Sequence, residues 1–244
     1  MNQLVLVTGA TGGVGASVCR HLSQRYQVIA VARDEHKLHA LCAEVPCLIS
    51  RVADLSDREA VDRLLDSLVS EFAHIPHVIN NAGVNKPARI DELEPIMLDA
   101  SIQVNALAPL QIMRRLLPAM REHDYGRIVN ITSGAPLNCF PGFGSYSASK
   151  ATLNALTVTA ARENADRNIK INLMSPGPVR SGMAPKASMQ PDVCHPTLDY
   201  LLSLEADGPT GKFFWLGREL PLFPDLEGVA WLEGTASERF PKVF

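Results

Sequence analysis

Tyr146 and Lys150 are the two residues whose types and spacing most clearly allow chemistry. They open a helical pattern that runs to about Asp166, and residues four apart on a helix share one face, with Cβ atoms about 5–6 Å apart. An ammonium about 4 Å from a phenol favours the phenolate by ~4 kcal/mol at an effective dielectric of about 20, which is roughly three pKa units. Such a tyrosine could exchange protons near neutral pH, although this spacing alone is more typical of an ordinary amphipathic helix.

A glycine-rich turn near the N-terminus could hold a phosphate. The apolar, β-prone run Leu4 to Thr8 is typical of a strand buried on both faces, and it leads into Thr8-Gly9-Ala10-Thr11-Gly12-Gly13-Val14-Gly15 and then a helical pattern. A strand, glycine turn and helix present N–H groups and a positive helix end to a phosphate. The spacing differs from the G-x-G-x-x-G of the usual dinucleotide fingerprint.

The end of the second predicted strand, Val28 to Val31, bears on which dinucleotide would bind. In dinucleotide folds an acid at this point suits a free ribose 2′-hydroxyl, and an arginine suits a 2′-phosphate. Arg33 therefore favours NADP(H) over NAD(H). Asp34 could be the ribose acid after a shift of one residue, or it could cap the helix predicted over Glu35–Glu44.

Alternating strand and helix patterns predict the α/β fold class. Short connections in the first 80 residues imply a Rossmann-type doubly wound parallel sheet of about seven strands, with helices on both faces in a three-layer sandwich. Ser56-Asp57-Arg58-Glu59 has the pattern of a capping box. Ligands bind at the carboxyl ends of such strands, where Gly9, Arg33, Asp54 and Asn80 fall. The later strands are predicted over Cys47–Val52, His77–Asn80, Arg127–Ile131, Ile169–Met174 and Gly211–Leu216.

Two further polar residues stand at places where chemistry could occur. Asn105 lies in a helical pattern from Pro95 to about His123 that Pro109 should kink or divide. By itself, an amide among apolar neighbours is more typical of a satisfied core residue. Ser133 follows the strand Arg127–Ile131 at its carboxyl end.

The C-terminal third has two segments with unusual composition. Residues 178–196 hold four prolines and two methionines without a clear period, and such a stretch in a compact domain is more often a lid or binding loop than filler. With the helix predicted after it, we interpret 178–205 as a substrate loop. Five of the eight phenylalanines and both tryptophans lie from Phe213 onward, so the aromatic tail 221–244 is expected to pack against something. We predict one domain over residues 1–244.

Composition argues against several classes of partner. The net charge of -3 offers no basic surface for nucleic acid. We find no apolar run of membrane-spanning length and no charged leader, so we expect no membrane partner and a cytoplasmic protein. Five scattered cysteines without a CxxC pattern suit reduced thiols. His36, His39, Cys42 and Cys47 fall on a predicted helix and strand, so no metal site is predicted.

These motifs together resemble the short-chain dehydrogenase/reductase family, in its compact single-domain branch. Thr8–Gly15 also fits the T-G-x-x-G-x-x-G of the longer sugar-nucleotide epimerase and dehydratase branch. The Asn80–Gly83 motif, the 13-residue step from Ser133 to Tyr146 and the short chain after Lys150 favour the compact branch. The matching pieces, in family order over about residues 1–183, are Thr8-Gly9-x-x-x-Gly13-x-Gly15, Asp54-Leu55, Asn80-Asn81-Ala82-Gly83, Val104-Asn105, Ser133, Tyr146-x-x-x-Lys150 and Pro176-Gly177.

The resemblance implies catalytic roles for four residues. Tyr146 would exchange a proton with a ketone or alcohol oxygen while hydride passes to or from a nicotinamide. Lys150 would lower the tyrosine pKa and bind the nicotinamide ribose, and Ser133 would stabilise the substrate oxygen. Asn105 would hold a water that links Lys150 to solvent.

The resemblance also implies a cofactor site at the strand ends. Gly9, Gly13 and Gly15 would take the pyrophosphate, Asp54 the adenine, Asn81 and Gly83 the adenosine side, and Val179 and Ser181 the nicotinamide amide. The full set of predicted cofactor residues is Thr8, Gly9, Thr11, Gly12, Gly13, Val14, Arg33, Asp54, Leu55, Asn81, Ala82, Gly83, Tyr146, Lys150, Pro176, Gly177, Val179 and Ser181.

The function that the resemblance implies is NADPH-linked reduction of a ketone, or oxidation of the secondary alcohol, on a small-molecule substrate. The chain looks most similar to 3-oxoacyl reductases and other ketoreductases, and the family commonly forms homodimers and homotetramers. The alternative is a catalytically silent nucleotide-sensing or scaffold protein of the same fold, against which the four intact catalytic positions argue. A mostly apolar substrate wall is expected from Leu137, Cys139, Phe140, Phe143, Met183 and Met189.

Overall fold

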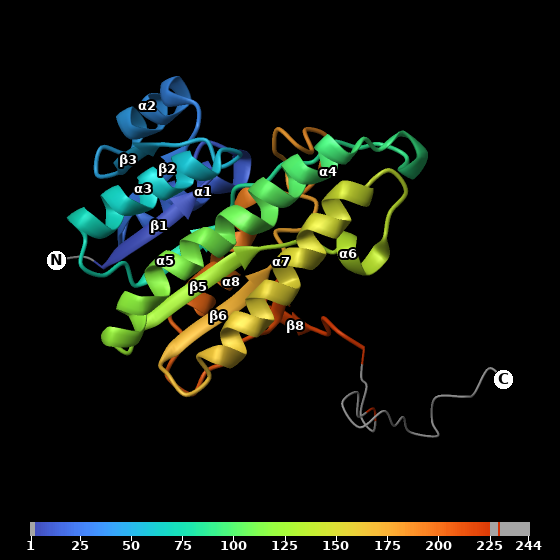
Figure 1. Cartoon of the computed structure of the whole chain (residues 1–244). Coiled ribbons are helices and arrows are strands. Elements are labelled where there is room, and N and C mark those ends of the chain that lie inside the picture. The colour runs from blue at the N-terminus through green and yellow to red at the C-terminus, as the bar shows by residue number, and fades with distance from the viewer. Residues whose placement is uncertain (1–2, 225–228, 230–244) are drawn as a thin grey trace.

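One eight-stranded sheet runs through the protein, in the order β3-β2-β1-β4-β5-β6-β7-β8 (Figure 1). The computed structural model describes residues 3–224 and 229. Neighbouring strands from β3 to β7 pair in parallel, and β8 is an antiparallel edge strand. The strands are β1 (Leu4–Thr8), β2 (Gln27–Ala32), β3 (Ile49–Val52), β4 (His77–Asn80), β5 (Gly126–Ile131), β6 (Ile169–Met174), β7 (Phe213–Trp215) and β8 (Arg218–Leu220).

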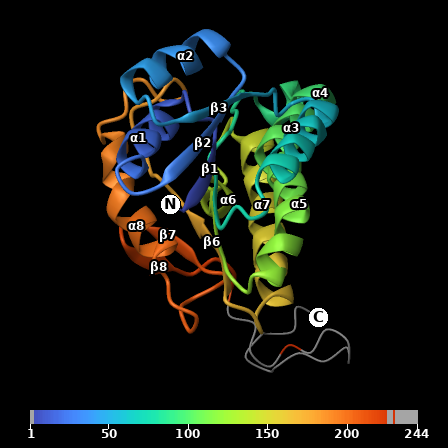
Figure 2. The same cartoon turned by 90° about the vertical axis from the view of Figure 1, so that its left-hand side faces the viewer.

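Helices cover both faces of this sheet (Figure 2). The α-helices are α1 (Gly13–Leu22), α2 (Glu35–Glu44), α3 (Arg58–Glu71), α4 (Pro95–Ile102), α5 (Ala108–Glu122), α6 (Ala135–Asn138), α7 (Gly144–Glu163) and α8 (His195–Leu202). Short helical turns η1 (Ile90–Glu92), η2 (Gln103–Leu107) and η3 (Pro191–Cys194) complete the list.

The continuous apolar strands produce two cores. Successive side chains of a strand point to opposite faces, so Val5 and Val7 of β1 pack with α1, α2 and α8, whereas Leu6 packs with α3, α5 and α7. Both sets are fully buried, which is what a parallel sheet between two helical layers requires. The predicted doubly wound, three-layer fold is confirmed, with eight strands in place of about seven.

The eighth strand was not predicted because its turn has an unusual sequence. β7 and β8 form a hairpin through Leu216 and Gly217 alone, with φ of 50° and 71°. Two-residue hairpin turns of this type need positive φ at both central positions and favour Asn-Gly or Asp-Gly. Because leucine rarely occupies the first of these positions, the sequence gives no indication of a turn here.

The start of α3 differs from the predicted capping box. Asp57 is the N-cap, and its side chain accepts a hydrogen bond from the backbone N–H of Glu59. Ser56 instead donates its hydroxyl to the carboxylate of Asp54, at 2.7 Å. The residue expected to cap the helix therefore holds a carboxylate at the end of β3.

The long helical segment from α4 to α5 is divided by the π-helical turn η2. Pro109 has no N–H to donate to the carbonyl of Asn105 in an α-helical pattern, and η2 ends two residues before this proline. By length and composition alone, Pro95–Glu122 is long and apolar enough to cross a membrane, contrary to the sequence expectation. Half of its most apolar 18-residue stretch is buried inside the fold. It packs on α3 and α7, as a core helix does.

Candidate active site

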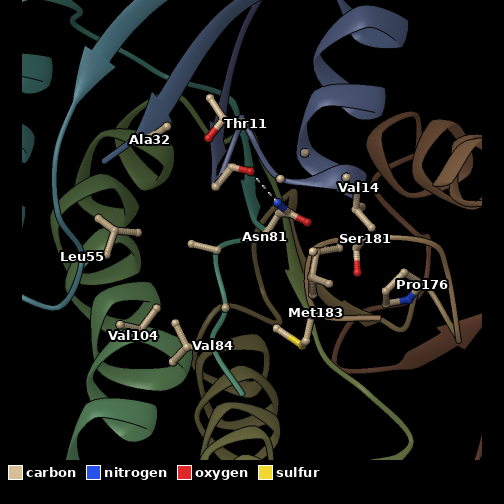
Figure 3. Close-up of a pocket in the computed structure, with 18 of the residues that line it drawn as sticks. Thr11, Val14, Ala32, Leu55, Asn81, Val84, Val104, Pro176, Ser181 and Met183 are labelled. Atoms are coloured by element: carbon tan, nitrogen blue, oxygen red, sulfur yellow. Dashed lines mark hydrogen bonds between the residues drawn. The ribbon is translucent and has the colours of Figure 1, made fainter. Parts of the chain in front are cut away.

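A cavity of about 470 Å³ opens at the carboxyl ends of the parallel strands. It lies beside β1 and β4, where the direction of the strand order reverses, the usual ligand position in such folds. Ala32 and Leu55 stand at one side, and Val14, Ser181 and Pro176 at the other (Figure 3). The predicted residues that line it are Gly9, Thr11, Gly12, Gly13, Val14, Gly15, Arg33, Asp54, Leu55, Asn81, Ala82, Gly83, Tyr146, Lys150, Pro176, Gly177, Val179, Ser181 and Met183.

The glycine turn leaves backbone N–H groups free for an anion. Gly9 has φ of 66°, and a Cβ on Gly15 would lie 2.1 Å from the Gly9 carbonyl oxygen. A Cβ on Gly13 would lie 2.8 Å from the carbonyl oxygen of Arg180. The N-cap residue Gly12 supplies no side-chain hydrogen bond to α1, and the first turn carries no acidic residue. The turn therefore fits a pyrophosphate at the positive end of this helix.

Thr8 and Asn81 hold the turn in place from behind. The Thr8 hydroxyl oxygen accepts hydrogen bonds of 3.1 Å from the N–H groups of Asn81 and Ala82. The Asn81 amide donates to the Thr8 carbonyl at 3.0 Å and to the Gly9 carbonyl at 3.2 Å, and Figure 3 shows one dashed bond at Asn81. Thr8 is only 1% exposed and does not line the cavity, so its place is beneath the turn.

Asp34 takes the helix-capping role in the structure. Its carboxylate accepts the backbone N–H of Lys37 at 3.0 Å and caps α2, and this hydrogen bond lowers its pKa. Arg33 lines the cavity and Asp34 does not. Asp54 also faces the cavity, where hydrogen bonds from the N–H and hydroxyl of Ser56 lower its pKa and Arg33 adds to the effect.

Tyr146 and Lys150 reach the cavity from the first turns of α7. Lys150 is 3% exposed, its Nζ donates to the Ile131 carbonyl at 2.6 Å, and burial lowers its pKa to about 7. Burial raises the pKa of Tyr146, while the nearby Ser133 hydroxyl acts in the opposite direction. The sequence predicts a lowered tyrosine pKa, so the direction is different: desolvation of the phenolate outweighs the hydrogen bond from Ser133.

Ser133 and Asn105 do not line the cavity but adjoin it. The Ser133 oxygen accepts the N–H of Ala135 at 3.1 Å, which leaves its O–H free to donate. The Asn105 side chain is fully bonded: its oxygen accepts the N–H of Val84 at 2.8 Å, and its amide donates to the Val84 carbonyl and the Ser149 hydroxyl, both at 2.9 Å. Its side chain is thus a satisfied core amide, and Pro109 has no N–H to donate to its backbone carbonyl.

A buried polar stripe behind Lys150 was missed in the sequence. Asn154 accepts the Thr132 hydroxyl at 2.6 Å, and Thr157 accepts the Asn130 amide at 2.8 Å, which ties α7 to β5. Lys150, Asn154 and Thr157 follow the i, i+4, i+7 spacing of one helix face. This polar periodicity inside an otherwise apolar pattern is the signal that could have found them.

The predicted substrate wall is only partly assembled at the cavity. Met183 lines it, whereas Leu137, Cys139, Phe140 and Phe143 do not. Phe143 touches the Tyr146 ring edge-on, with centroids 6.3 Å apart, and Phe140 is 51% exposed. Met189 pairs with Val179 across a β-bridge. Lining residues that were not predicted are Val31, Ala32, Ala53, Val84, Val104, Ile131, Thr132, Gly182 and Ala184.

Metal-ligating side chains do not gather at this site. Among residues 3–224 and 229, no group of three or more His, Cys, Asp or Glu side chains is arranged to hold a metal ion. The described cysteines are all free thiols.

Known proteins match both the sequence and the fold. A sequence model of the short chain dehydrogenase family matches residues 3–192. A 3-oxoacyl-[acyl-carrier-protein] reductase of Thermotoga maritima is 30% identical over 189 residues, which are 75% of this chain and 77% of that protein.

Two solved structures with a bound cofactor have the same fold. A metagenomic short-chain oxidoreductase in complex with NADP has a TM-score of 0.78 and 30% identity, over 87% of this chain and 96% of the other. A 4-hydroxyisoleucine dehydrogenase complexed with NADH has a TM-score of 0.78 and 28% identity, over 88% and 96%. With the family match over most of its length, this chain belongs to the short-chain dehydrogenase/reductase family of NAD(P)-dependent oxidoreductases.

Proposed function

We propose that this enzyme reduces a ketone with NADPH, or oxidises the corresponding secondary alcohol. The observation that carries the proposal is the position of Tyr146 and Lys150 at the cavity, with the Ser133 hydroxyl beside the phenol. A phenol that keeps its proton at neutral pH can deliver it to a carbonyl oxygen, as a general acid must. When bound, the nicotinamide supplies the hydride for reduction or accepts it for oxidation.

The catalytic group consists of Tyr146, Ser133, Lys150 and Asn105. Tyr146 Oη gives its proton to the substrate oxygen, and the free O–H of Ser133 donates to the same oxygen and stabilises its developing charge. Lys150, with a pKa of about 7, exchanges its own proton near neutral pH and replenishes the phenol. The Asn105 carbonyl holds a water on the path from Lys150 to solvent, while its side chain fixes Val84 and Ser149.

NADP(H) is the proposed cofactor because of the residues at the end of β2. Arg33 faces the cavity near Asp54, whose pKa its charge helps to lower, and Asp34 is engaged as a helix cap. An arginine fork suits a 2′-phosphate. The two related structures carry NADP in one case and NADH in the other.

The substrate is a small-molecule carbonyl compound or alcohol, and the segment 178–205 forms part of its site through Met183, which lines the cavity. Relatives of this chain include a reductase of 3-oxoacyl groups. We also propose a homodimer or homotetramer to which the tail 221–244 contributes. Most of that tail, residues 225–228 and 230–244, lies outside the described residues. Its first part, including Leu222 and Phe223, lines a groove of about 320 Å³ beside α7.

A panel of ketones and secondary alcohols, assayed by nicotinamide absorbance with both cofactors, tests this function. We expect NADPH oxidation with at least one ketone and slower oxidation of NADH. Tight NADPH binding without turnover of any member would instead favour the nucleotide-sensing alternative. Turnover of alcohols and ketones with NADH alone would contradict the proposed cofactor.

A further inference from the structure

The chain between β6 and α8 makes one excursion over the cavity and returns to α1. Val179 and the stretch from Ser181 to Ala184 line the cavity. On the return, the Arg180 N–H donates to the Met189 carbonyl at 2.8 Å, and η3 then packs on α1. We call residues 178–194 the cofactor-facing segment, and its geometry depends on how firmly η3 is held.

A cluster of polar side chains fastens the end of this segment to α1. The Ser17 hydroxyl and His195 Nε2 are 2.9 Å apart. The rings of His195 and His21 stack with centroids 4.1 Å apart and planes 14° from parallel. His21 Nε2 lies 2.9 and 3.0 Å from the two carboxylate oxygens of Asp199 on α8, and Arg25 pairs with the same carboxylate. We call Ser17, His21, His195 and Asp199 the latch.

The latch acts on the helix that carries the phosphate turn. A Cβ on Gly13, at the first residue of α1, would come 2.8 Å from the Arg180 carbonyl oxygen and 3.0 Å from Ser181 Cα. The cofactor-facing segment thus approaches α1 at Gly13, through Arg180 and Ser181, and the residue that follows it, His195, contacts Ser17 of α1. Moving η3 away from α1 would shift Val179 and Ser181, because Arg180 and Val179 are paired to Met189.

The protonation state of His195 should decide whether the latch keeps η3 against α1. Burial and the neighbouring His21 lower the pKa of His195, while Asp192 of η3, Asp199 of α8 and the bond to Ser17 oppose them. A folded-state pKa below the usual histidine value means that the latched form binds fewer protons than the released form. Acidification through about pH 6.5 therefore favours release of η3 from α1. Protonation of His195 would add a second positive charge to the latch, close to that of Arg25.

We propose that the latch positions Val179 and Ser181 for the cofactor, and that proton uptake by His195 releases them. His195 and Ser17 are positioning residues, because neither lines the cavity. The proposal rests on the proposed cofactor site but makes its own prediction about the segment, which can be tested without any cofactor.

Limited proteolysis tests the mechanical part. Arg180 and Lys186 are exposed trypsin sites within the segment. Ser17→Ala and His195→Gln should be cleaved there about three- to tenfold faster than the wild type near pH 8, since a lost hydrogen bond contributes roughly 0.5–1.5 kcal/mol. His39→Gln, on the exposed face of α2 with a side chain 69% exposed, is the matched control and should be cleaved at the wild-type rate. Equal rates for all four proteins would overturn the latch.

Cofactor titration tests the proton dependence. NADH is the probe, because it lacks the 2′-phosphate that itself titrates. From about pH 8 to about pH 5.5 the wild-type affinity should fall about three- to fivefold more than that of His195→Gln, which should start weaker and change little. Parallel pH profiles would overturn the proton step. If neither protein bound NADH or NADPH, the proposed cofactor site would fail, and the proteolysis result would still decide whether the latch holds the segment.

Discussion

Lys150 Nζ lies 6.0 Å from the centre of the Tyr146 ring, and it donates its hydrogen bond to the Ile131 carbonyl. The ammonium is thus buried next to the phenol without being bonded to it. Burial acts on the two groups in opposite senses: it lowers the pKa of the lysine and raises that of the tyrosine. Both pKa shifts favour the neutral forms of the two side chains.

The buried lysine should make stability depend on pH. Its pKa falls from 10.5 to about 7 on folding, so the unfolded chain binds more protons between these values and the free energy of unfolding should rise with pH across that window. Relative to Lys150→Met, the wild type should gain stability from about pH 7 to about pH 9.5, by less than ~5 kcal/mol at 1.36 kcal/mol per pKa unit.

Urea unfolding at several pH values measures this difference. Tyr146 has a raised pKa, so it weakens the fold only above about pH 10, and it is present in both proteins. A difference between wild type and Lys150→Met that stayed constant over the whole window would mean that the lysine is not desolvated in the folded enzyme.

Arg33→Ala should weaken NADPH binding about 10- to 100-fold, because a hydrogen bond to a charged group contributes roughly 1.5–3 kcal/mol, and it should change NADH binding little. Fluorescence titration with both cofactors measures this. Asp34→Ala is the matched control at the neighbouring residue. It removes the cap of α2 and should cost about 1 kcal/mol of stability, but NADPH should still bind more tightly than NADH. Equal losses of NADPH and NADH affinity in Arg33→Ala would rule out a 2′-phosphate contact.

Gly13→Ala should abolish tight cofactor binding. Its Cβ would meet the backbone of Arg180 and Ser181 at 2.8 and 3.0 Å, so the cofactor-facing segment must move off the phosphate turn. Gly134→Ala is the control, because its Cβ would only approach the Asn138 side chain at 3.4 Å. Calorimetric titration with NADPH compares the two. Wild-type affinity in Gly13→Ala would show that the segment can shift without affecting the site.

Two truncations separate the roles of the C-terminal residues. Ending the chain after Leu220 removes Leu222 and Phe223 from the groove beside α7, whereas ending it after Pro224 keeps them. The shorter protein should melt at a lower temperature, since burying a large apolar side chain contributes roughly 1.5–3 kcal/mol. Loss of oligomers in both would place the oligomer contact beyond Pro224. If neither melting temperature nor oligomer size changed, the tail would have no part in stability or assembly.

Local patterns in the sequence were enough to predict the fold and the glycine-rich turn at the cavity. The apolar runs of β1, β2 and β6 and the glycines between Gly9 and Gly15 each act through neighbours in the chain, so their meaning is visible without the structure. Asn105 was different. Its side-chain partners Val84 and Ser149 come from two other elements, so only the structure shows that the side chain is a clamp rather than a water ligand.

Long-range packing also explains why the predicted Tyr146 pKa and the predicted substrate wall differ from the structure. The pKa of Tyr146 depends on how deeply α7 is buried, which helical spacing does not record. Leu137 and Phe140 were expected at the substrate wall from their apolar character, yet they stand 47% and 51% exposed. The position of a loop residue depends on the path of the loop, and sequence composition does not determine that path.

The most direct test of the proposed chemistry is the NADPH-dependent turnover of a ketone substrate by Tyr146→Phe. Losing a positioned proton donor should lower the rate about 10²- to 10⁴-fold. The affinity for NADPH should stay within about threefold of the wild type, because the ring and its contact with Phe143 remain and the lost hydroxyl contributes at most a modest hydrogen bond. Retention of more than about a tenth of the wild-type rate would contradict the assignment of Tyr146 as the proton donor.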